Sequence, residues 1–216
     1  MLEKLKLYNE PFWQNYSCGD EKNPEVFSFV EKGSFVCLSA PHSTQTFTNK
    51  HVKKSDLFTG AITKYVAEEN QFSYIVRNKF VPKKVLISDF IVENHLEKHF
   101  FLDIHAMVDG NGFDLAVGTG YVSVRQYEAQ LQIIDELCRK YNLTYRVNHP
   151  NYTGCAGLVG RLQKNTGMAN AIQLEWSRKY RDIFQNFGNV CHVTVPFLTA
   201  LAININARQN ENLLVV

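Results

Sequence analysis

The sequence predicts an α/β protein with a mixed, mostly parallel sheet and helices on both faces of that sheet. Segments with strand-like and helix-like patterns alternate along the chain, which favours a parallel sheet covered by helices. No repeat, low-complexity tract or Pro/Gly/Ser-rich linker divides the 216 residues, so we expect a single domain over residues 1–216. The composition, 45% hydrophobic and 20% charged, is that of an ordinary globular protein.

The first half of the chain is expected to begin the sheet with a hairpin. Val26–Val30 and Phe35–Ala40 flank the polar turn at residues 31–34, which predicts two paired strands and makes the sheet mixed. Ser55 is a suitable N-cap for a helix that continues to about Glu69 with apolar residues at helical spacing. Further extended segments are predicted at residues 72–76, 85–92 and 99–104.

The second half is expected to continue the alternation of helices and strands. Ser123 predicts the start of a helix that ends near Tyr141. A last helix is predicted to be capped by Thr194, with Pro196 tolerated in its first turn. Between them we expect strands at residues 143–147 and 169–176 and a helix at residues 178–187.

Charge, cysteine content and hydropathy exclude several classes of protein. The chain has 23 Lys+Arg and 21 Asp+Glu, and a net charge of +2 does not indicate a nucleic-acid or membrane partner. Its five cysteines form no C-x-x-C pair, which argues against a disulfide framework and favours a reducing compartment. No signal peptide is visible, and the apolar stretch Val193–Ile203 is too short to cross a bilayer. We therefore expect a cytoplasmic protein.

Polar residues follow three predicted strands at the end where α/β sheets bind ligands. His42 comes directly after one strand, His105 after a second, and Glu175 near the end of a third. Two neutral imidazoles can ligate zinc, and a carboxylate outside the coordination shell can move protons. Asp103 lies two residues before His105, on the same face of the strand, where it could fix the imidazole tautomer. This set of residues predicts a mononuclear metal hydrolase.

A third metal ligand is harder to place, although catalytic zinc sites usually have three protein ligands. Gln45 stands three residues after His42, where a carboxylate would be a familiar arrangement. The nearest carboxylate downstream is Asp56, which is expected to open a helix whose positive dipole end favours an anion. Asp109 and Asp114 are weaker candidates.

Simpler interpretations remain open for the same residues. A histidine at a loop start is often structural, and Glu175 could pair with Arg178 on the surface. Cys155 lies in a glycine-containing loop with His149 nearby, which allows a cysteine-dependent hydrolase or an idle thiol. The chain could also be a non-catalytic binding module that uses the same cleft without a metal. No G-x-S-x-G elbow or phosphate-binding loop is present.

Four short segments in order resemble the N-formylglutamate amidohydrolase family, which is related to the zinc carboxypeptidases and aspartoacylases. They are Ser39-Ala-Pro-His-Ser43, Leu102-Asp-Ile-His105, Asp114–Gly120 and Ala171–Arg178. The resemblance implies a phosphorylase/hydrolase-like α/β fold and a zinc-bound water that cleaves an amide bond of a small N-acyl amino acid or peptide-like substrate.

The resemblance also implies roles for individual residues. His42 and His105 would be zinc ligands, Asp56 the third ligand, and Glu175 the general base. Arg178 and Arg181 would hold the site or a substrate carboxylate.

Two segments depart from the family pattern. Its Asp-x-Asn-Arg segment has only Arg77-Asn78 as a remnant, and Ser43-Thr44 replaces a glycine-rich run. Both regions are expected to shape substrate recognition, which makes Arg77 a candidate substrate-binding residue and leaves the acyl group and the amine open.

Overall fold

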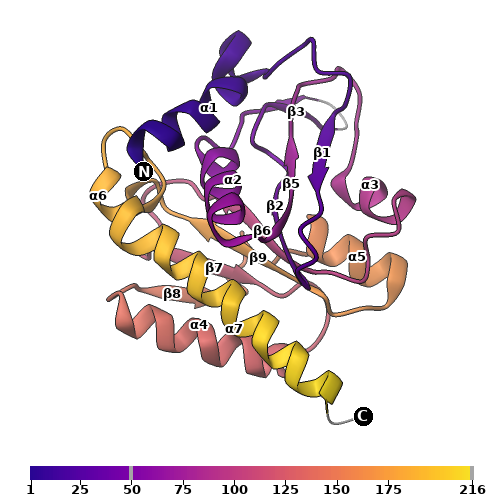
Figure 1. Ribbon diagram of the computed structural model, residues 1–216, viewed down its shortest axis with the longest axis vertical. Helices are drawn as coiled ribbons and strands as arrows, with labels where there is room; N and C mark the ends of the chain where they lie inside the picture. The colour runs from indigo at the N-terminus through magenta and orange to yellow at the C-terminus, as the bar shows by residue number, and fades with distance from the viewer. Residues whose placement is uncertain (49–50, 215–216) are drawn as a thin grey trace.

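A seven-stranded sheet forms the centre of the protein (Figure 1). The computed structural model describes residues 1–48 and 51–214, with side chains as far as residue 209. The strands lie in the order β1-β5-β2-β6-β9-β7-β8. Their bounds are β1 Phe27–Val30, β2 Val36–Ala40, β5 Ser73–Arg77, β6 Phe100–Ala106, β7 Leu115–Gly118, β8 Tyr145–Val147 and β9 Ala171–Trp176.

The predicted mixed, mostly parallel sheet is confirmed. Strands β5, β2, β6 and β9 run parallel to one another in the middle of the sheet. Antiparallel pairs occur where β1 joins β5 and where β7 joins β9. At the far edge, β8 runs parallel to β7. The four central strands therefore end at the same edge of the sheet.

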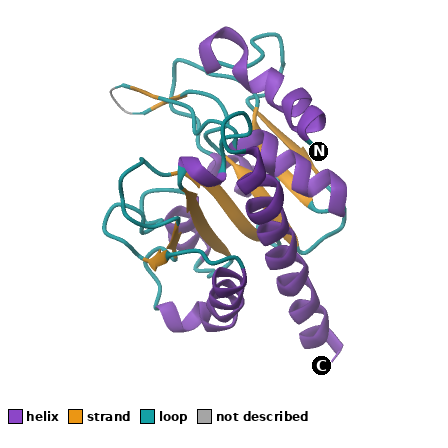
Figure 2. Ribbon diagram, turned by 90° about the vertical axis from the view of Figure 1, so that its left-hand side faces the viewer, coloured by secondary structure: helices purple, strands orange, loops and turns teal. Residues whose placement is uncertain are grey.

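Helices cover both faces of this sheet, as predicted (Figure 2). On one face lie α1 Leu2–Ser17, α2 Thr59–Asn70, α4 Glu128–Lys140 and α7 Val195–Leu214. On the other face lie α3 Ile87–Glu93 and α5 Leu158–Thr166. A small antiparallel pair, β3 Thr46–Phe47 and β4 Val52–Lys53, stands apart from the main sheet.

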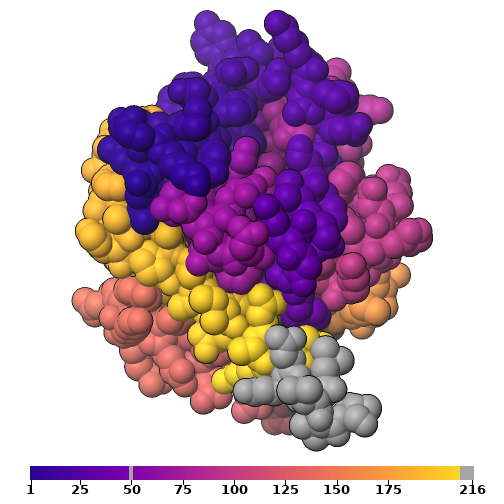
Figure 3. Space-filling view, in the orientation of Figure 1, coloured from indigo at the N-terminus to yellow at the C-terminus, as the bar shows by residue number. Residues whose placement is uncertain are grey.

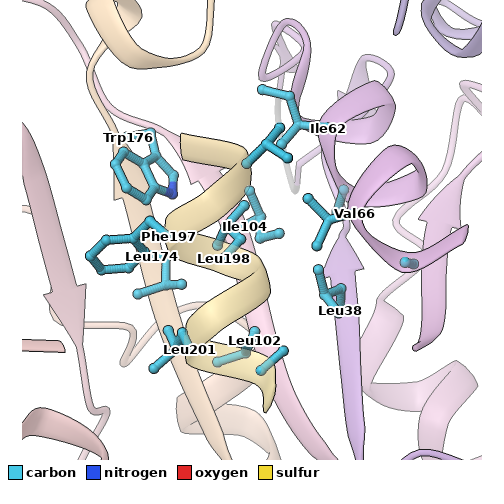
Figure 4. Close-up of a cluster of buried hydrophobic side chains, with 14 of the residues drawn as sticks. Leu38, Ile62, Val66, Leu102, Ile104, Leu174, Trp176, Phe197, Leu198 and Leu201 are labelled. Carbon is cyan, nitrogen blue, oxygen red and sulfur yellow. The ribbon is translucent and has the colours of Figure 1, made fainter. Parts of the chain in front are cut away.

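Alternation along the strands separates two apolar clusters. Side chains from β2, β6 and β9 meet α2 and α7 in the larger cluster (Figure 4). It includes Leu38, Leu102, Ile104, Leu174 and Trp176 from the strands, Ile62 and Val66 from α2, and Phe197, Leu198 and Leu201 from α7. Phe101 and Ala171 belong to the second cluster, with α3 and α5. Because successive strand residues point to opposite faces, Asp103, His105 and Glu175 lie on the same face as this second cluster.

The predicted hairpin between the first two strands is wrong. β5 lies between β1 and β2 and pairs with both of them. The polar residues that follow β1 bind the first residue of β5 instead of closing a two-stranded turn. The amide of Lys32 donates to Ser73 Oγ, and the amide of Ser73 donates to Ser34 Oγ. A local turn pattern cannot reveal that a strand from later in the chain is inserted.

Two other predictions in the first half also need correction. Helix α2 begins at Thr59, not after Ser55, so Asp56 lies before the helix and not in its first turn. The segment at residues 85–92 is not a strand, because α3 occupies Ile87–Glu93. Its buried residues Ile87 and Ile91 are four residues apart, a spacing that places them on one face of a helix.

The helix starting near Ser123 is confirmed, but the end of the chain differs from the prediction. The Ser123 hydroxyl accepts a hydrogen bond from the amide of Arg125 at the start of the 3₁₀ turn η1, Val124–Tyr127, which leads into α4. The segment predicted as a helix at residues 178–187 contains only the 3₁₀ turn η2, Arg178–Tyr180, before α6, Phe187–Asn189. The helices α1 and α5 and the strand β7 are absent from the sequence prediction.

Thr194 is not a helix cap. It ends a π-helical turn, η3, Val190–Thr194, that joins α6 to α7. Its buried hydroxyl donates to the carbonyl of Tyr180. The helical run is therefore longer than the apolar stretch alone predicts.

Phe187–Gln209 is long and apolar enough, by length and composition, to cross a membrane. This differs from the expectation based on the shorter apolar stretch within it. In the folded chain 44% of the most apolar 18-residue window of that segment is buried, and α7 packs on the sheet and against α2 and α4. Figure 3 shows α7 (yellow) reaching the surface between these neighbours. Packing in the core accounts for much of its apolar character.

Candidate active site

The parallel strands bring the predicted site residues to one pocket. His42 follows β2, Arg77 ends β5, His105 lies near the end of β6, and Glu175 lies near the end of β9. His105 and Glu175 are partners in the β6–β9 register. All four line a pocket of about 430 Å³. The predicted placement of these residues at one edge of the sheet is therefore observed.

The β3–β4 hairpin explains how Asp56 reaches the same site. The chain leaves His42, forms the hairpin and returns, so that the amide of Asp56 donates to the carbonyl of His42 at 2.7 Å. Within the hairpin, Thr46 Oγ1 lies 3.2 Å from His42 Nδ1. Asp56 is buried, with 5% of its surface exposed. The carboxylate therefore depends on the hairpin for its position, and not on a helix dipole.

His105 stands between two carboxylates. Its Nε2 lies 2.8 Å from Asp103 Oδ2, and its Nδ1 lies 2.9 Å from Asp56 Oδ2. The Ser39 hydroxyl donates to the other oxygen of Asp103 at 2.7 Å. Asp103 thus contacts His105 from the side away from Asp56, as expected for a residue that orients the ring.

The carboxylates set the charge state of His105. Burial by itself lowers the pKa of His105, but Asp103 and Asp56 outweigh that effect and raise the pKa to about 10. Burial also acts to raise the pKa of Asp56, yet its hydrogen bond with His105 and the nearby Lys53 ammonium hold it well below its usual range. Asp103 and Asp56 thus favour the protonated, cationic form of the His105 ring that lies between them.

His42 and Glu175 are shifted in ways that suit their predicted roles. Burial lowers the pKa of His42 well below its ordinary value, so the imidazole is neutral, as a metal ligand must be. Burial raises the pKa of Glu175, while the His105 charge acts in the opposite direction. Gln173 Nε2 donates a hydrogen bond to Glu175 Oε1 at 2.7 Å. A carboxyl group with a raised pKa is suited to proton transfer.

The donor types of this site fit zinc, because two imidazoles and one carboxylate are a common zinc ligand set. His105 Nδ1 and Asp56 Oδ2 face each other, and the His42 ring centroid lies 5.1 Å from that of His105. Across residues 1–48 and 51–214, however, no group of three or more His, Cys, Asp or Glu side chains is arranged so that it could hold a metal ion. The residue types therefore fit zinc, but the three side chains do not form a ready metal site in the described structure.

Gln45, which stands in place of a carboxylate, and the weaker candidate ligands Asp109 and Asp114 do not line the pocket. Gln45 donates to the carbonyl of Tyr16 in α1. Asp109 accepts a hydrogen bond from the amide of Arg178, and Asp114 accepts from Thr144. Asp56 is therefore the carboxylate from this set that contacts His105.

The predicted substrate-binding arginines have different surroundings. Arg77 lines the pocket and is buried, but its Nε donates to the Pro41 carbonyl and its Nη2 to the Val85 carbonyl. Arg178 is about half exposed, pairs with Asp182 and is not part of the pocket lining. The alternative surface pair between Glu175 and Arg178 is not formed in the described structure.

Several pocket residues are absent from the sequence analysis. Lys53 comes from the hairpin, Lys84 from the segment before α3, and Arg161 from α5. Lys53 Nζ lies 3.4 Å from Asp56 Oδ1. Lys53 lies three residues before Asp56, so the sequence could have indicated that the two side chains pair. No such signal exists for Arg161, whose position depends on how α5 packs. With Arg77, these residues give the pocket cationic walls.

Cys155 is not arranged as a nucleophile in this pocket. Its neighbours Gly154 and Ala156 line the pocket, but Cys155 itself does not. The His149 ring contacts those of Phe113 and Tyr152 at centroid distances of 5.1 and 5.6 Å. The structure therefore gives no support to a Cys155–His149 pair.

Comparison with known proteins finds similarity in structure but not in sequence. No protein-family model and no curated protein matches the chain. A gene product of Agrobacterium tumefaciens has a TM-score of 0.57 and 11% identity, covering 88% of this chain and 98% of that one. A bacteriophage poly-gamma-glutamate hydrolase has a TM-score of 0.52 and 16% identity, covering 89% and 93%.

An N-formylglutamate amidohydrolase from Ralstonia eutropha also has a TM-score of 0.52, with 11% identity and coverage of 86% of this chain and 99% of that one. At these identities the similarity concerns the fold. The hydrolase-like α/β fold implied by the sequence resemblance is therefore confirmed.

Proposed function

We propose that this protein is a metal-dependent hydrolase that cleaves an amide bond of a small, acidic N-acyl amino acid or peptide-like substrate. The observation that carries the proposal is the position of Glu175, in register with His105 and facing the pocket that also contains His42. Two proteins with this fold are a poly-gamma-glutamate hydrolase and an N-formylglutamate amidohydrolase, which supports amide hydrolysis as the reaction class.

The proposed metal is zinc, which His42, Asp56 and His105 would hold. His105 would first lose the Nδ1 proton that faces Asp56, because an imidazole ligand must be neutral. When bound, zinc supplies a Lewis acid and makes water a stronger acid. Asp103 keeps the ring of His105 oriented through its contact with Nε2. The neutral state of His42 leaves that imidazole free to bind a cation.

Glu175 is proposed to move the proton. It accepts a proton from the attacking water and returns it to the nitrogen of the leaving amine. Gln173 binds Oε1 of Glu175, whereas Oε2 has no hydrogen-bond partner among the described residues. The raised pKa of Glu175 lets the same carboxyl group act first as a base and then as an acid.

The pocket walls favour an anionic substrate. Lys53, Arg77, Lys84 and Arg161 line the pocket, whereas Glu175 is the acidic residue in the same lining. Charge-assisted hydrogen bonds to carboxylates are stronger than those between neutral groups. We therefore infer that a carboxylate of the substrate binds at the cationic wall while the amide bond lies near Glu175.

The test is a comparison of acidic and neutral amides. Zinc-loaded protein is incubated with N-formylglutamate, N-acetylglutamate, poly-gamma-glutamate and the matching glutamine derivatives, before and after chelation. We expect release of the amine from at least one acidic substrate, slower turnover of its glutamine counterpart, and loss of activity without metal. Zinc binding without turnover of any acidic amide would contradict the proposed reaction.

A second candidate function is a binding module without catalysis. It is favoured by the absence, among the described residues, of a ready three-ligand metal cluster. This alternative predicts that acidic amides bind to the pocket unchanged, with the same affinity in the presence and absence of zinc. Calorimetric titration with and without chelator separates the two candidates.

A further inference from the structure

The segment that carries Asp56 contains an unusual backbone conformation. Phe58, two residues further on, has φ 73° and ψ −13°, in the left-handed region. This region is uncommon for residues other than glycine and is especially unfavourable for bulky ones. Such conformations persist where the surrounding structure holds them in place, and they cluster at functional sites. The surroundings of Phe58 therefore bear on how Asp56 is positioned.

Three aromatic rings from distant parts of the chain contact one another at this point. The ring centroids of Trp13 and Phe58 are 5.9 Å apart, those of Phe58 and Phe184 are 5.7 Å apart, and those of Trp13 and Phe184 are 6.0 Å apart. We call Trp13, Phe58 and Phe184 the aromatic triangle. Phe58 is buried beneath the other two, which are 48% and 54% exposed. None of the three rings lines the pocket.

Hydrogen bonds hold the backbone on both sides of Phe58. The carbonyl of Leu57 accepts from Arg181 Nη1 at 3.2 Å. The carbonyl of Asp56 accepts from both the amide and the hydroxyl of Thr59, at 3.2 and 2.7 Å. The backbone between the hairpin and α2 is thus held on both sides of Phe58. Phe58 therefore belongs to a short, fixed segment that begins with Asp56, and its ring is the part of this segment that contacts Trp13 and Phe184.

We propose that the aromatic triangle is a positioning device, and that Phe58 is the positioning residue that fixes the Asp56 carboxylate against His105. Arg181 serves the same segment through Leu57. The inference rests on the proposed function where it treats Asp56 as a metal ligand. The Asp56–His105 contact itself is present in the structure without a metal, and it can be followed independently.

The decisive variant is Phe58→Gly, because glycine suits the left-handed backbone but lacks the ring. Trp13→Ala removes a second ring of the triangle. Phe35→Ala is the matched control. It removes a partly buried ring whose centroid lies 6.3 Å from that of Phe100, and neither of these rings lines the pocket. Thermal unfolding of all variants gives the loss of stability against which the other measurements are compared.

Two readouts are measured on each variant. In the metal-free protein, NMR follows the imidazole N–H proton of His105 that faces Asp56, assigned by its loss in Asp56→Asn. Titration with zinc gives the metal affinity. We expect Phe58→Gly and Trp13→Ala to broaden or remove the N–H signal and to weaken zinc binding about 10–100-fold, as is typical for partners outside the coordination shell. Phe35→Ala should leave both unchanged.

An intact N–H signal and unchanged zinc affinity in Phe58→Gly would overturn the proposal, because the backbone would then hold the Asp56 carboxylate against His105 without the Phe58 ring. Equal effects in Phe35→Ala at a similar loss of stability would overturn it as well. The NMR readout requires neither metal nor turnover. A wild-type protein that binds no zinc and cleaves no amide would refute the proposed function, while the His105 signal would still decide the role of the triangle.

Discussion

The backbone amide of Asp56 donates to the carbonyl oxygen of His42 at 2.7 Å, although a hairpin separates the two residues in the chain. This hydrogen bond closes the base of the β3–β4 hairpin and brings a carboxylate beside His105. The hairpin also supplies Thr46 to His42 and Lys53 to Asp56. The β3–β4 hairpin therefore contacts two of the candidate ligands, His42 and Asp56.

Removing the candidate ligands tests the metal site. We expect the double variant His42→Ala/His105→Ala to lose zinc, measured by elemental analysis, because it removes both imidazole donors. Asp56→Asn should weaken zinc binding by about 10–100-fold or more. The exposed His192 serves as a control, and His192→Ala should retain the metal. Unchanged affinity in Asp56→Asn would place the third ligand elsewhere.

Replacing the proposed base tests the chemistry separately from the metal. Glu175→Gln keeps the shape of the side chain but cannot accept a proton, so kcat should fall by about 10²–10⁴-fold on the substrate that the wild type cleaves. Zinc content and melting temperature should stay close to those of the wild type. Glu136→Gln, at an exposed position of α4, is the matched control and should retain full activity. Activity of Glu175→Gln within a few-fold of wild type would rule out the assignment.

The cationic wall predicts how affinity depends on substrate charge. Arg161→Ala and Lys84→Ala should each raise KM for an acidic amide roughly tenfold, which corresponds to about 1.4 kcal/mol. A neutral amide of similar size should be unaffected. Arg178→Ala should leave KM unchanged, because its guanidinium binds Asp182 outside the pocket lining. Steady-state kinetics on both substrates checks these outcomes, and a specific rise of KM in Arg178→Ala would return that arginine to the substrate site.

Asp182 predicts a dependence of stability on pH away from the site. Burial acts to raise the pKa of Asp182, but amide protons of Gln185 and Phe184 and the Arg178 guanidinium bind the carboxylate and lower it. A carboxylate whose pKa is lower in the folded state stabilises the protein above the pKa of the unfolded chain, about 3.9, and this stability is lost as the pH falls through the folded-state pKa.

Asp182→Asn should therefore lower the free energy of unfolding by about 1–3 kcal/mol at pH 7. The difference from wild type should shrink as the pH falls below about 4 towards the lowered pKa of the folded state, because the wild-type carboxyl group then also becomes neutral. Urea unfolding at several pH values measures both effects. Asp135→Asn, in the partly exposed Asp135–Arg139 pair of α4, is the control and should show a smaller difference. A difference independent of pH would exclude the charge as the cause.

Much of the candidate site follows from strand positions that are visible in the sequence. His42, His105 and Glu175 come at or after the ends of apolar segments, and parallel strands bring such ends to one edge of a sheet. The two-residue period of a strand also places Asp103 and His105 on the same face. The order of the strands was less accessible, because β5 enters between β1 and β2 from later in the chain.

By itself, therefore, the sequence determined the α/β class, the faces of the strands and the strand-end residues, because these depend on local periodicity and on alternation along the chain. Only the tertiary structure decided that Asp56 contacts His105, that Arg161 lines the pocket and Arg178 does not, and that Phe58 contacts Trp13 and Phe184. These contacts join segments far apart in the chain. Their formation depends on how helices, hairpin and sheet pack together, and no local pattern specifies that packing.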